Sequence, residues 1–570
     1  MNEPDRAQPT ERAAALRWIA EDPEESDQRQ LQRVLAAAMA GEAGAAAELR
    51  HHMSPPLTFG TAGLRAPVRA GANGMNVATV IRTSAAVAAW LVRGGRGGGV
   101  VVLGRDARTG SERFLTVAAE VFAASGFDVR VLGSALPTPV LAYATRALDA
   151  VAGVQVTASH NPPADNGYKL YLQAGTQLVP PADAQIEALI GQVGPARSVP
   201  RSAEYTTLGP DLVESYVDSA AAVRRGTRQG IRIALTPMHG VGGATAMAAL
   251  ALAGFTDVHV VAAQAQPDPS FPTVAFPNPE EPGAADLLLE LAARIDADLA
   301  IALDPDADRC ALGFRDAQGW RMLRGDETGA LLGEYLLCCA ERSGAAAPDW
   351  PADPLVATTI VSSSLLGKIA AAHSVRYAET LTGFKWLVRA GDGAGTGLVF
   401  AYEEALGSCV DPQRVRDKDG ISAAVLGADL AAELAASGAD FSTALRRLYR
   451  RHGVHRTAAV SLRVTDLGVI ALTMARLRAK PPRQLLGLPV ECADLAPRTD
   501  ALRITGAGLR VVIRPSGTEP KLKCYLEIVC EPGTATDELH DPLRPAERLA
   551  TERMATLRAE VAALLGVDAC

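Results

Sequence analysis

The sequence is poor in cysteine, has no excess of positive charge and contains no long hydrophobic run. Its eight cysteines are spread over 570 residues without a CxxC pair, which favours free thiols in a reducing cytoplasm over a disulfide framework. Acidic residues outnumber basic ones by 64 to 56, which argues against general nucleic-acid binding but is compatible with local basic pockets. No apolar run approaches the roughly 18 residues of a membrane span. The charged segment 1–18 lacks the apolar core of a secretory signal. We therefore predict a cytoplasmic protein with no nucleic-acid or membrane partner.

What is present is the composition of a folded protein of several domains. Hydrophobic residues make up 48% of the chain and charged residues 21%, values typical of globular proteins. At about 150 residues per domain, the length predicts about four domains. The segment before residue 50 has apolar residues at three- and four-residue spacing and is predicted to be helical.

Three stretches repeat the order strand, helix, strand, helix, strand. The strands are predicted at 99–103, 127–132 and 153–158, then at 231–236, 257–263 and 297–303, and finally at 354–361, 375–381 and 397–402. This order is typical of a doubly wound parallel sheet. Ligands of such sheets bind beyond the carboxyl ends of the strands. Ser159, Asp304 and Glu403 each lie at the end of the third strand of a repeat.

The C-terminal part has a different pattern. Short alternating strands around a Gly/Ser/Thr turn within 502–531 suggest an antiparallel α+β domain. We predict the α/β class, with three similar doubly wound α/β domains followed by a smaller α+β C-terminal domain. The predicted boundaries are 1–50 for a helical extension, 51–208, 209–322 and 323–455 for domains I to III, and 456–570 for domain IV.

The first motif is TASHNPPADNGYKLY, residues 157–171. Ser159 lies where an apolar strand ends and a loop with two prolines begins. Its hydroxyl either forms a local turn or helix cap or is held outward as a nucleophile. His160, Asn161 and Lys169 are near enough in sequence to serve proton transfer or to bind an anion. Serine needs a base or a metal to activate it. The GxSxG motif is absent, so acyl transfer is not favoured.

The second motif is LDPDADRC, in which Asp304, Asp306 and Asp308 alternate after a predicted buried strand. Three carboxylates so close together repel one another unless a cation neutralises them, and oxygen-only ligation suits Mg²⁺. The EF-hand pattern fails, because Arg309 and Arg315 occupy the positions of its glycine and its last glutamate. The alternative is an Asp/Pro turn with solvated carboxylates.

The third motif is FAYEEALG, residues 400–407. Its adjacent Glu403 and Glu404 can accept hydrogen bonds from vicinal sugar hydroxyls, although a solvated glutamate pair is the alternative. The segment LTGFKWL lies upstream, and Lys418 adds positive charge downstream.

The fourth motif is RPSGTEPKLK, residues 514–523. A turn with two basic side chains, two hydroxyls and a glycine amide forms a candidate phosphate cradle. An ordinary surface turn is the alternative. The candidate ligands are Arg514, Ser516, Gly517, Thr518 and Lys523.

Two nucleotide-binding motifs are excluded. HGVGG resembles the start of a dinucleotide fingerprint, but Thr245 replaces the third glycine and no acidic residue ends the next strand. GxxxxGK[ST] does not occur, so neither NAD-dependent chemistry nor P-loop ATP hydrolysis is expected.

The four motifs together fit phosphoryl transfer on a sugar phosphate, which needs positioning and charge neutralisation. On these motifs the chain resembles the α-D-phosphohexomutase family over about residues 58–530. The resemblance implies that Ser159 carries the phosphoryl group and binds Mg²⁺ together with Asp304, Asp306 and Asp308. It also implies catalytic roles for His160, Lys169 and Arg65 (of GTAGLR), with Lys169 and Arg65 as candidate acid and base. The implied substrate-binding residues are Arg309, Gly383, Phe384, Lys385, Glu403, Glu404 and Lys418, and the implied phosphate-binding residues are those of the fourth motif.

The family mechanism implies interconversion of hexose 1-phosphate and hexose 6-phosphate through phosphoserine and a bisphosphate, with a sugar bisphosphate such as glucose 1,6-bisphosphate as activator. Ala307 and Ala405 stand where many phosphoglucomutases have glycine and serine, and the motifs resemble the branch that includes phosphopentomutases. Glucose, then mannose, is the expected hexose, and a ribose or deoxyribose phosphate is the alternative. A non-catalytic sugar-phosphate-binding protein would be expected to lack Ser159 or a metal carboxylate. We expect a monomer or a dimer.

Overall fold

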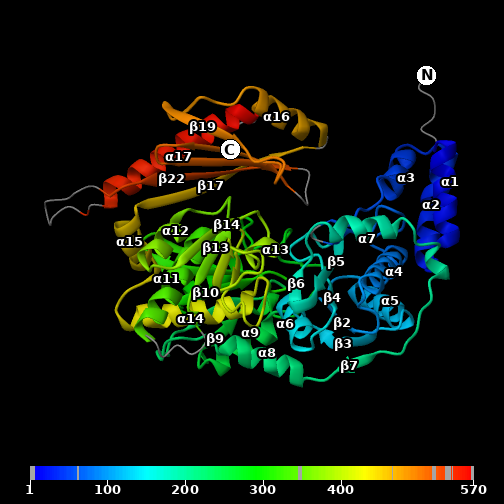
Figure 1. Ribbon diagram of the computed structural model, residues 1–570, viewed down its shortest axis with the longest axis horizontal. Coiled ribbons are helices and arrows are strands. Elements are labelled where there is room, and N and C mark those ends of the chain that lie inside the picture. The colour runs from blue at the N-terminus through cyan, green and yellow to red at the C-terminus, as the bar shows by residue number, and fades with distance from the viewer. Residues whose placement is uncertain are drawn as a thin grey trace. The chain divides into compact units, whose positions relative to one another are not determined.

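The computed structural model describes residues 7–60, 63–343, 350–464, 467–516, 521–532, 541 and 543–566 (Figure 1). The chain forms two compact units. The first comprises Met1–Arg224, Gln229–Gly313 and Gly407–Ala428, and the second comprises Arg225–Arg228, Phe314–Leu406 and Asp429–Cys570.

The N-terminal segment forms three helices, as its periodicity predicts. They are α1 (Pro9–Glu21), α2 (Glu25–Ala40) and α3 (Ala45–Met53). Their apolar faces meet in a small core that includes Ala15, Leu31 and Leu49. These helices therefore stabilise one another by burying the apolar stripes that each carries.

The first sheet has a parallel centre. β2 (Val100–Arg105) lies between β4 (Ala152–Val156) and β3 (Asp128–Ala135) and runs parallel to both. α5 (Ser111–Ala124) and α6 (Thr138–Ala147) connect these strands, and right-handed crossovers place the two helices on opposite faces of the sheet. The further elements of this part are α4 (Val77–Arg93), β6 (Thr176–Gln177), α7 (Ala182–Ile190), β7 (Thr206–Leu208) and α8 (Asp211–Ala221).

Three antiparallel strands extend this sheet, one of them the short β6, which pairs with the strand after β4, and the sequence pattern did not predict them. β5 (Asp165–Leu172) runs antiparallel to β4, and β1 (Leu64–Pro67) runs antiparallel to β5. The second half of the first motif is therefore a strand rather than a loop. The residues of β5 between its two ends are all buried, so β5 shows no alternation of polar and apolar residues of the kind that marks a half-exposed strand.

The second sheet repeats the order of the first. β8 (Ile233–Thr236) lies between β10 (Leu299–Leu303) and β9 (Val258–Val260) and runs parallel to both. The connecting helices are α9 (Gly243–Leu252) and α10 (Asp286–Arg294). β11 (Cys310–Asp316) returns antiparallel to β10, as β5 does to β4, and is followed by β12 (Gly319–Met322).

The third sheet has the same parallel centre. β13 (Leu355–Thr359) lies between β15 (Leu398–Glu403) and β14 (Arg376–Thr380). In all three sheets the third strand pairs with the first, so the repeat is one of topology. The other elements of this region are α11 (Gly325–Ser343), α12 (Leu365–Ala372), α13 (Phe384–Leu387), β16 (Gly407–Cys409), α14 (Gly420–Ala436) and α15 (Phe441–His452).

The C-terminal sheet is antiparallel throughout, as predicted. Its order is β17-β22-β21-β20-β19-β18. The strands are β17 (Val454–Arg463), β18 (Gln484–Leu485), β19 (Leu488–Asp494), β20 (Leu502–Gly506), β21 (Leu509–Pro515) and β22 (Lys521–Cys530). α16 (Leu467–Ala479) and α17 (Leu543–Leu565) pack against the sheet and complete its core.

The described residues contain seven cysteines, and all seven are free thiols. Among these residues, no single helix has the length and apolarity needed to cross a membrane, although α14 and α15 meet that test as a pair bent by 89°.

Candidate active site

Ser159 follows the first sheet's third strand, three residues beyond the end of β4. Its side chain is nearly inaccessible, at 1% exposure, and its backbone has the left-handed φ of 54°, which is uncommon for a residue other than glycine. The amide of Ser159 donates to Thr157 Oγ1 at 2.8 Å. The local turn is thus closed by the Thr157 hydroxyl, and the hydroxyl of Ser159 remains available for other contacts.

That hydroxyl contacts two potential proton acceptors. Ser159 Oγ donates to Asp304 Oδ2 at 2.9 Å and lies 3.2 Å from His160 Nδ1. Burial, together with the positive charges of Arg309 and Arg65, lowers the pKa of His160 well below its usual value. His160 is therefore a neutral imidazole at pH 7, the form that can accept a proton.

Asp304, Asp306 and Asp308 lie directly after the buried strand β10, and all three are buried, with exposures of 0%, 0% and 1%. Their oxygens lie within 4.8 Å of one another. The interpretation of these residues as solvated carboxylates of a surface turn is therefore wrong. Ala307 has the left-handed φ of 53°, which turns the loop so that the aspartates on either side of it converge.

Two lysines neutralise part of this charge. Lys169 Nζ, on β5, donates to Asp306 Oδ2 at 2.6 Å and to Asp308 Oδ2 at 2.8 Å. Lys418 Nζ lies 3.3 Å from Asp308 Oδ2. Because β5 returns alongside β4, the strand that the sequence pattern missed is the one that brings Lys169 to the aspartates.

The three carboxyl groups differ in their proton affinity. Burial and the neighbouring Asp306 raise the pKa of Asp304 well above its usual value. Burial also acts against ionisation of Asp308, but Lys169, Lys418 and Arg309 outweigh it and hold the pKa of Asp308 below its usual value. Asp304, beside the Ser159 hydroxyl, therefore binds a proton more readily than Asp308 does.

A divalent cation fits this cluster. Asp306 Oδ1 and Asp308 Oδ1 are buried and accept no hydrogen bond from the residues that the structure describes. A buried carboxylate oxygen without a partner is unfavourable. Three convergent carboxylates, two of which have an oxygen without a hydrogen-bond donor among the described residues, are a ligand set that suits Mg²⁺.

Arg65 and Arg309 complete the charged lining. Arg65, on β1, donates from Nη1 to Asn161 Oδ1 at 3.4 Å. Burial lowers the pKa of Arg65, while Asp306 and Asp308 oppose that shift. The Arg309 amide donates to Asp304 Oδ1 at 3.0 Å, and Arg309 Nε lies 3.8 Å from Asp308 Oδ1.

Arg108 is a functional residue that the sequence analysis missed. It lies in the loop after β2, and its guanidinium donates to four backbone carbonyls of the Ser159 loop: those of Ser159 (2.5 Å), Asn161 (2.6 Å), Pro162 (2.8 Å) and Asp165 (3.1 Å). Asp106 lies 3.5 Å from Arg108 Nε. The position of Arg108 could have indicated it, because the GRDARTGS loop follows the carboxyl end of the parallel strand β2.

The candidate sugar-binding residues belong to the second unit. Glu404 Oε2 accepts from Ser362 Oγ at 3.0 Å and from Thr359 Oγ1 at 3.2 Å. Glu403 is 7% exposed, so the interpretation as a solvated glutamate pair is wrong for Glu403. Gly383, with φ 111°, precedes the short helix α13, which contains Phe384 and Lys385.

The fourth motif is described only in part. Arg514 lies on β21, Ser516 follows it, and Lys523 lies on β22, paired in register with Arg514. Gly517 and Thr518 lie outside the described residues. The first unit thus brings together Ser159, His160, Lys169, Arg65, the three aspartates, Arg309 and Lys418, while the sugar and phosphate motifs lie in the second unit.

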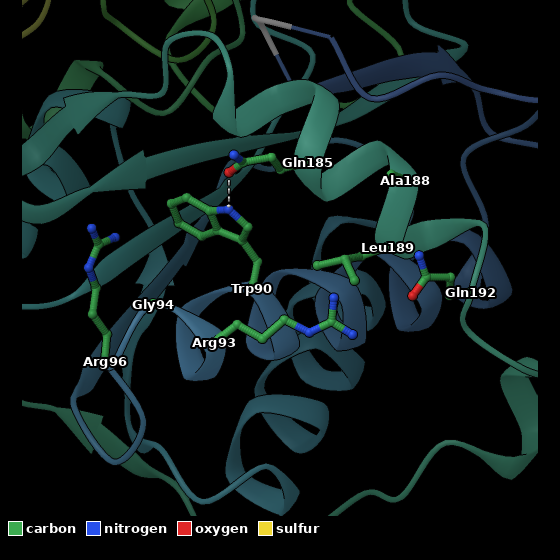
Figure 2. Close-up of a pocket in the computed structure, with 8 residues that line it drawn as sticks. All are labelled: Trp90, Arg93, Gly94, Arg96, Gln185, Ala188, Leu189 and Gln192. Carbon is green, nitrogen blue, oxygen red and sulfur yellow. Dashed lines mark hydrogen bonds between the residues drawn. The ribbon is translucent and has the colours of Figure 1, made fainter.

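A surface cavity of about 460 Å³ lies elsewhere in the first unit, between the end of α4 and α7 (Figure 2). Trp90 Nε1 donates to Gln185 Oε1 at 2.8 Å across it, and Arg93 and Arg96 flank it. None of the Ser159 cluster lines this cavity.

Comparison with known proteins finds family models that match four consecutive regions of the chain. The phosphoglucomutase/phosphomannomutase models for α/β/α domains I, II and III match residues 56–196, 214–318 and 324–452, and the C-terminal domain model matches 462–541. A Haemophilus influenzae protein named "Probable phosphomannomutase" is 42% identical over 439 residues, covering 75% of this chain and 87% of its own. A phosphopentomutase of Mus musculus is 33% identical over 547 residues, covering 86% and 87%. The crystal structure of a phosphoglucomutase/phosphomannomutase family protein from Burkholderia thailandensis has a TM-score of 0.66 at 20% identity, covering 88% of this chain and 96% of its own.

Proposed function

Because the chain belongs to the phosphoglucomutase/phosphomannomutase family, whose members are intramolecular phosphotransferases, we propose that it interconverts hexose 1-phosphate and hexose 6-phosphate through phosphoserine at Ser159. Glucose is the proposed hexose, and mannose is the next candidate. The observation that carries the proposal is the contact of Ser159 Oγ with Asp304 Oδ2 at 2.9 Å, inside a cluster of three buried aspartates and two lysines.

In this proposal, the half-reaction that forms phosphoserine uses these contacts. Ser159 Oγ attacks a phosphorus of the sugar bisphosphate, so that the Oγ–P bond forms and the sugar O–P bond breaks. His160 Nδ1, 3.2 Å from Oγ, accepts the hydroxyl proton, and the Lys169 ammonium donates a proton to the departing sugar oxygen. The opposite half-reaction returns both protons, since it runs the same steps in reverse on the other end of the sugar.

The remaining side chains of the first unit stabilise charge. Arg65, Arg309 and Lys418 offer fixed positive charge to the phosphoryl oxygens. Mg²⁺ bound by Asp304, Asp306, Asp308 and Ser159 would withdraw charge from the phosphoryl group during transfer. Arg108 holds the loop that presents Ser159 and touches no reacting atom, so it is a positioning residue.

The motifs of the second unit supply recognition in this proposal. Glu403 and Glu404 accept hydrogen bonds from neighbouring sugar hydroxyls, and Gly383, Phe384 and Lys385 help to distinguish the two ends of the substrate. Arg514, Ser516 and Lys523 bind the phosphate that is not transferred, together with Gly517 and Thr518. Glucose 1,6-bisphosphate is the proposed activator, because it can phosphorylate Ser159.

A pentose phosphate is the second candidate. The mouse relative named "Phosphopentomutase" aligns with 86% of this chain, whereas the Haemophilus influenzae relative named "Probable phosphomannomutase" aligns with 75%. In addition, position 405 is alanine where many phosphoglucomutases have serine, so the sugar motif offers one hydroxyl fewer to a hexose.

Phosphorus NMR of the purified protein with Mg²⁺ and a trace of glucose 1,6-bisphosphate tests both candidates. Glucose 1-phosphate, mannose 1-phosphate and ribose 1-phosphate are supplied separately. Conversion of a hexose 1-phosphate to its 6-phosphate is expected, together with loss of all conversion in Ser159→Ala. Conversion of ribose 1-phosphate alone would replace the hexose by a pentose, and an active Ser159→Ala variant would contradict the phosphoserine.

A further inference from the structure

Within the second unit, a partly buried network of charged and hydroxyl side chains joins the third sheet to the C-terminal sheet. Its members are Ser362, Ser363 and Glu379 on the side of the third sheet, and Arg510 and Glu527 on the side of the C-terminal sheet; we call them the Arg510 network. The phosphoryl-transfer chemistry proposed above uses none of them.

Arg510 lies at the centre of this network. From β21, its Nη1 donates to Glu379 Oε1 at 3.0 Å and its Nη2 lies 2.9 Å from Glu527 Oε2. Its Nη2 also donates to the backbone carbonyl of Ser362. The Arg510 side chain is 13% exposed, so it is positioned mainly by these partners.

Glu527 binds the turn that follows β13, residues 360–364, which also contains Ser362. Its Oε1 accepts from Ser363 Oγ at 2.7 Å and from the Ser364 amide at 2.8 Å. Although burial opposes ionisation of Glu527, the contacts with His455 and Arg510 outweigh it, and the pKa of Glu527 falls to about 2. The carboxylate is therefore ionised at neutral pH, and it binds the turn, His455 and Arg510 at once.

The turn itself holds the sugar motif. Ser362 Oγ donates to Glu404 Oε2 at 3.0 Å, and the Glu404 amide donates back to Ser362 Oγ at 3.2 Å. Ser362 is thus bonded through its hydroxyl to Glu404 and through its carbonyl to Arg510. The turn follows β13, whose carboxyl end adjoins that of β15 in the parallel sheet.

Apolar contacts fix the same junction. Ile360 and Val361, at the start of the turn, are buried with Ala501 and Val512 of the C-terminal sheet. Moreover, Arg510 and Arg514 both lie on β21, four residues apart, which is about 13 Å along a strand. The phosphate motif is therefore connected to Glu404 through one strand, one guanidinium and one serine.

We propose that Arg510 is a positioning residue that fixes Glu404 for sugar binding, by clamping the Ser362 turn to the strand that carries the phosphate motif. This inference rests on the proposed function in that it takes Glu404 as a sugar ligand. The inference extends the proposed function, because it makes recognition of the sugar depend on the docking of the C-terminal sheet.

Steady-state kinetics and hydrogen exchange of Arg510→Gln test this proposal. Loss of hydrogen bonds to a charged group is expected to raise KM for the sugar phosphate at least about tenfold, with kcat changed much less because Ser159 is untouched. Exchange at the Glu404 amide is expected to accelerate. The matched control is Arg478→Gln, since Arg478 lies in the same domain but pairs with the exposed Asp494 and Asp500; it should leave KM and exchange unchanged.

Two further variants keep the test decisive if Arg510→Gln is poorly folded. Ser362→Ala removes the hydroxyl that binds Glu404, and Glu379→Gln weakens the hold on Arg510 at a position that is 25% exposed. Both are expected to raise KM and to accelerate exchange at Glu404. If only Ser362→Ala has these effects, or if no variant has them, the role of Arg510 is refuted. Hydrogen exchange needs no substrate, so it decides the coupling even if the wild-type protein moves no phosphoryl group.

Discussion

At the scale of single residues, the left-handed backbone of Ser159 is held by one guanidinium group. A non-glycine residue pays an energetic penalty in this conformation, of order 1 kcal/mol or more, and keeps it only where its surroundings enforce it. Arg108 provides that constraint by donating to the backbone carbonyls of Ser159, Asn161 and Pro162. The partners of Arg108 are backbone atoms some fifty residues away in sequence, so its role corresponds to no local sequence motif. The motifs therefore identified Ser159 but not Arg108.

Replacement of Arg108 by lysine should therefore lower kcat about 10- to 100-fold, since one ammonium cannot bind four carbonyls and Ser159 loses its alignment. KM should change little, because Arg108 contacts no substrate. Steady-state kinetics with Arg105→Lys as control measures this effect. Arg105 is the last residue of β2, just before the loop that carries Arg108, but it pairs with the exposed Glu112. Equal kcat for Arg108→Lys and wild type would show that the loop holds its shape without the clamp.

At the scale of elements, the first strand of each repeat (β2, β8 and β13) was predictable because it is a short apolar run that is buried along most of its length and followed by a helix. β5 and β11 were not, since each is an extra antiparallel strand that follows the Ser159 loop or the aspartate loop without a helix between. The HGVGG segment after β8 shows a second limit. Its glycines suit a dinucleotide loop, but in the structure they allow close packing on the aspartate loop: a Cβ on Gly240 would lie 2.4 Å from Pro305 Cα and Pro305 O, and one on Gly242 would lie 2.5 Å from Ala307 Cβ.

Gly240→Ala should consequently push the aspartate loop out of place. The added methyl meets backbone rather than a flexible side chain, and overpacking of this kind lowers the free energy of unfolding by about 1–3 kcal/mol. Thermal unfolding with and without Mg²⁺ should show a lower melting temperature and a smaller stabilisation by the ion. Gly209→Ala is the control, because nothing lies within 4 Å of its added Cβ. A Gly240→Ala protein with the melting temperature and Mg²⁺ response of wild type would contradict this account.

At the scale of the whole molecule, buried charge is used differently in the two units. The first unit gathers carboxylates beside lysines and leaves oxygens for a cation, whereas the second uses buried acids to join two sheets. In the second unit Glu527 is paired with Arg510 and stays ionised, but Asp326 has only neutral donors. Asp326 Oδ1 accepts from the Ser363 amide at 2.6 Å and from the Tyr402 hydroxyl at 3.2 Å. Burial, with Glu404 and Glu527 adding repulsion, raises the pKa of Asp326 to about 7.

Asp326→Asn should stabilise the protein more at pH 8 than at pH 5. An acid with a higher pKa in the folded state binds its proton more tightly when folded, so the free energy of unfolding falls as pH rises from about 4 through 7. The amide keeps the Oδ1 acceptor and has no charge to bury, so at pH 8 it should recover up to about 4 kcal/mol. Melting temperatures of both proteins at the two pH values measure the effect. Asp494→Asn is the control, because the exposed Asp494 is bonded to Arg478, which lowers its pKa, and its loss should bring no gain at pH 8. If Asp326→Asn is destabilising at both pH values, the carboxylate is ionised at no net penalty, and the turn at Ser363 depends on its charge.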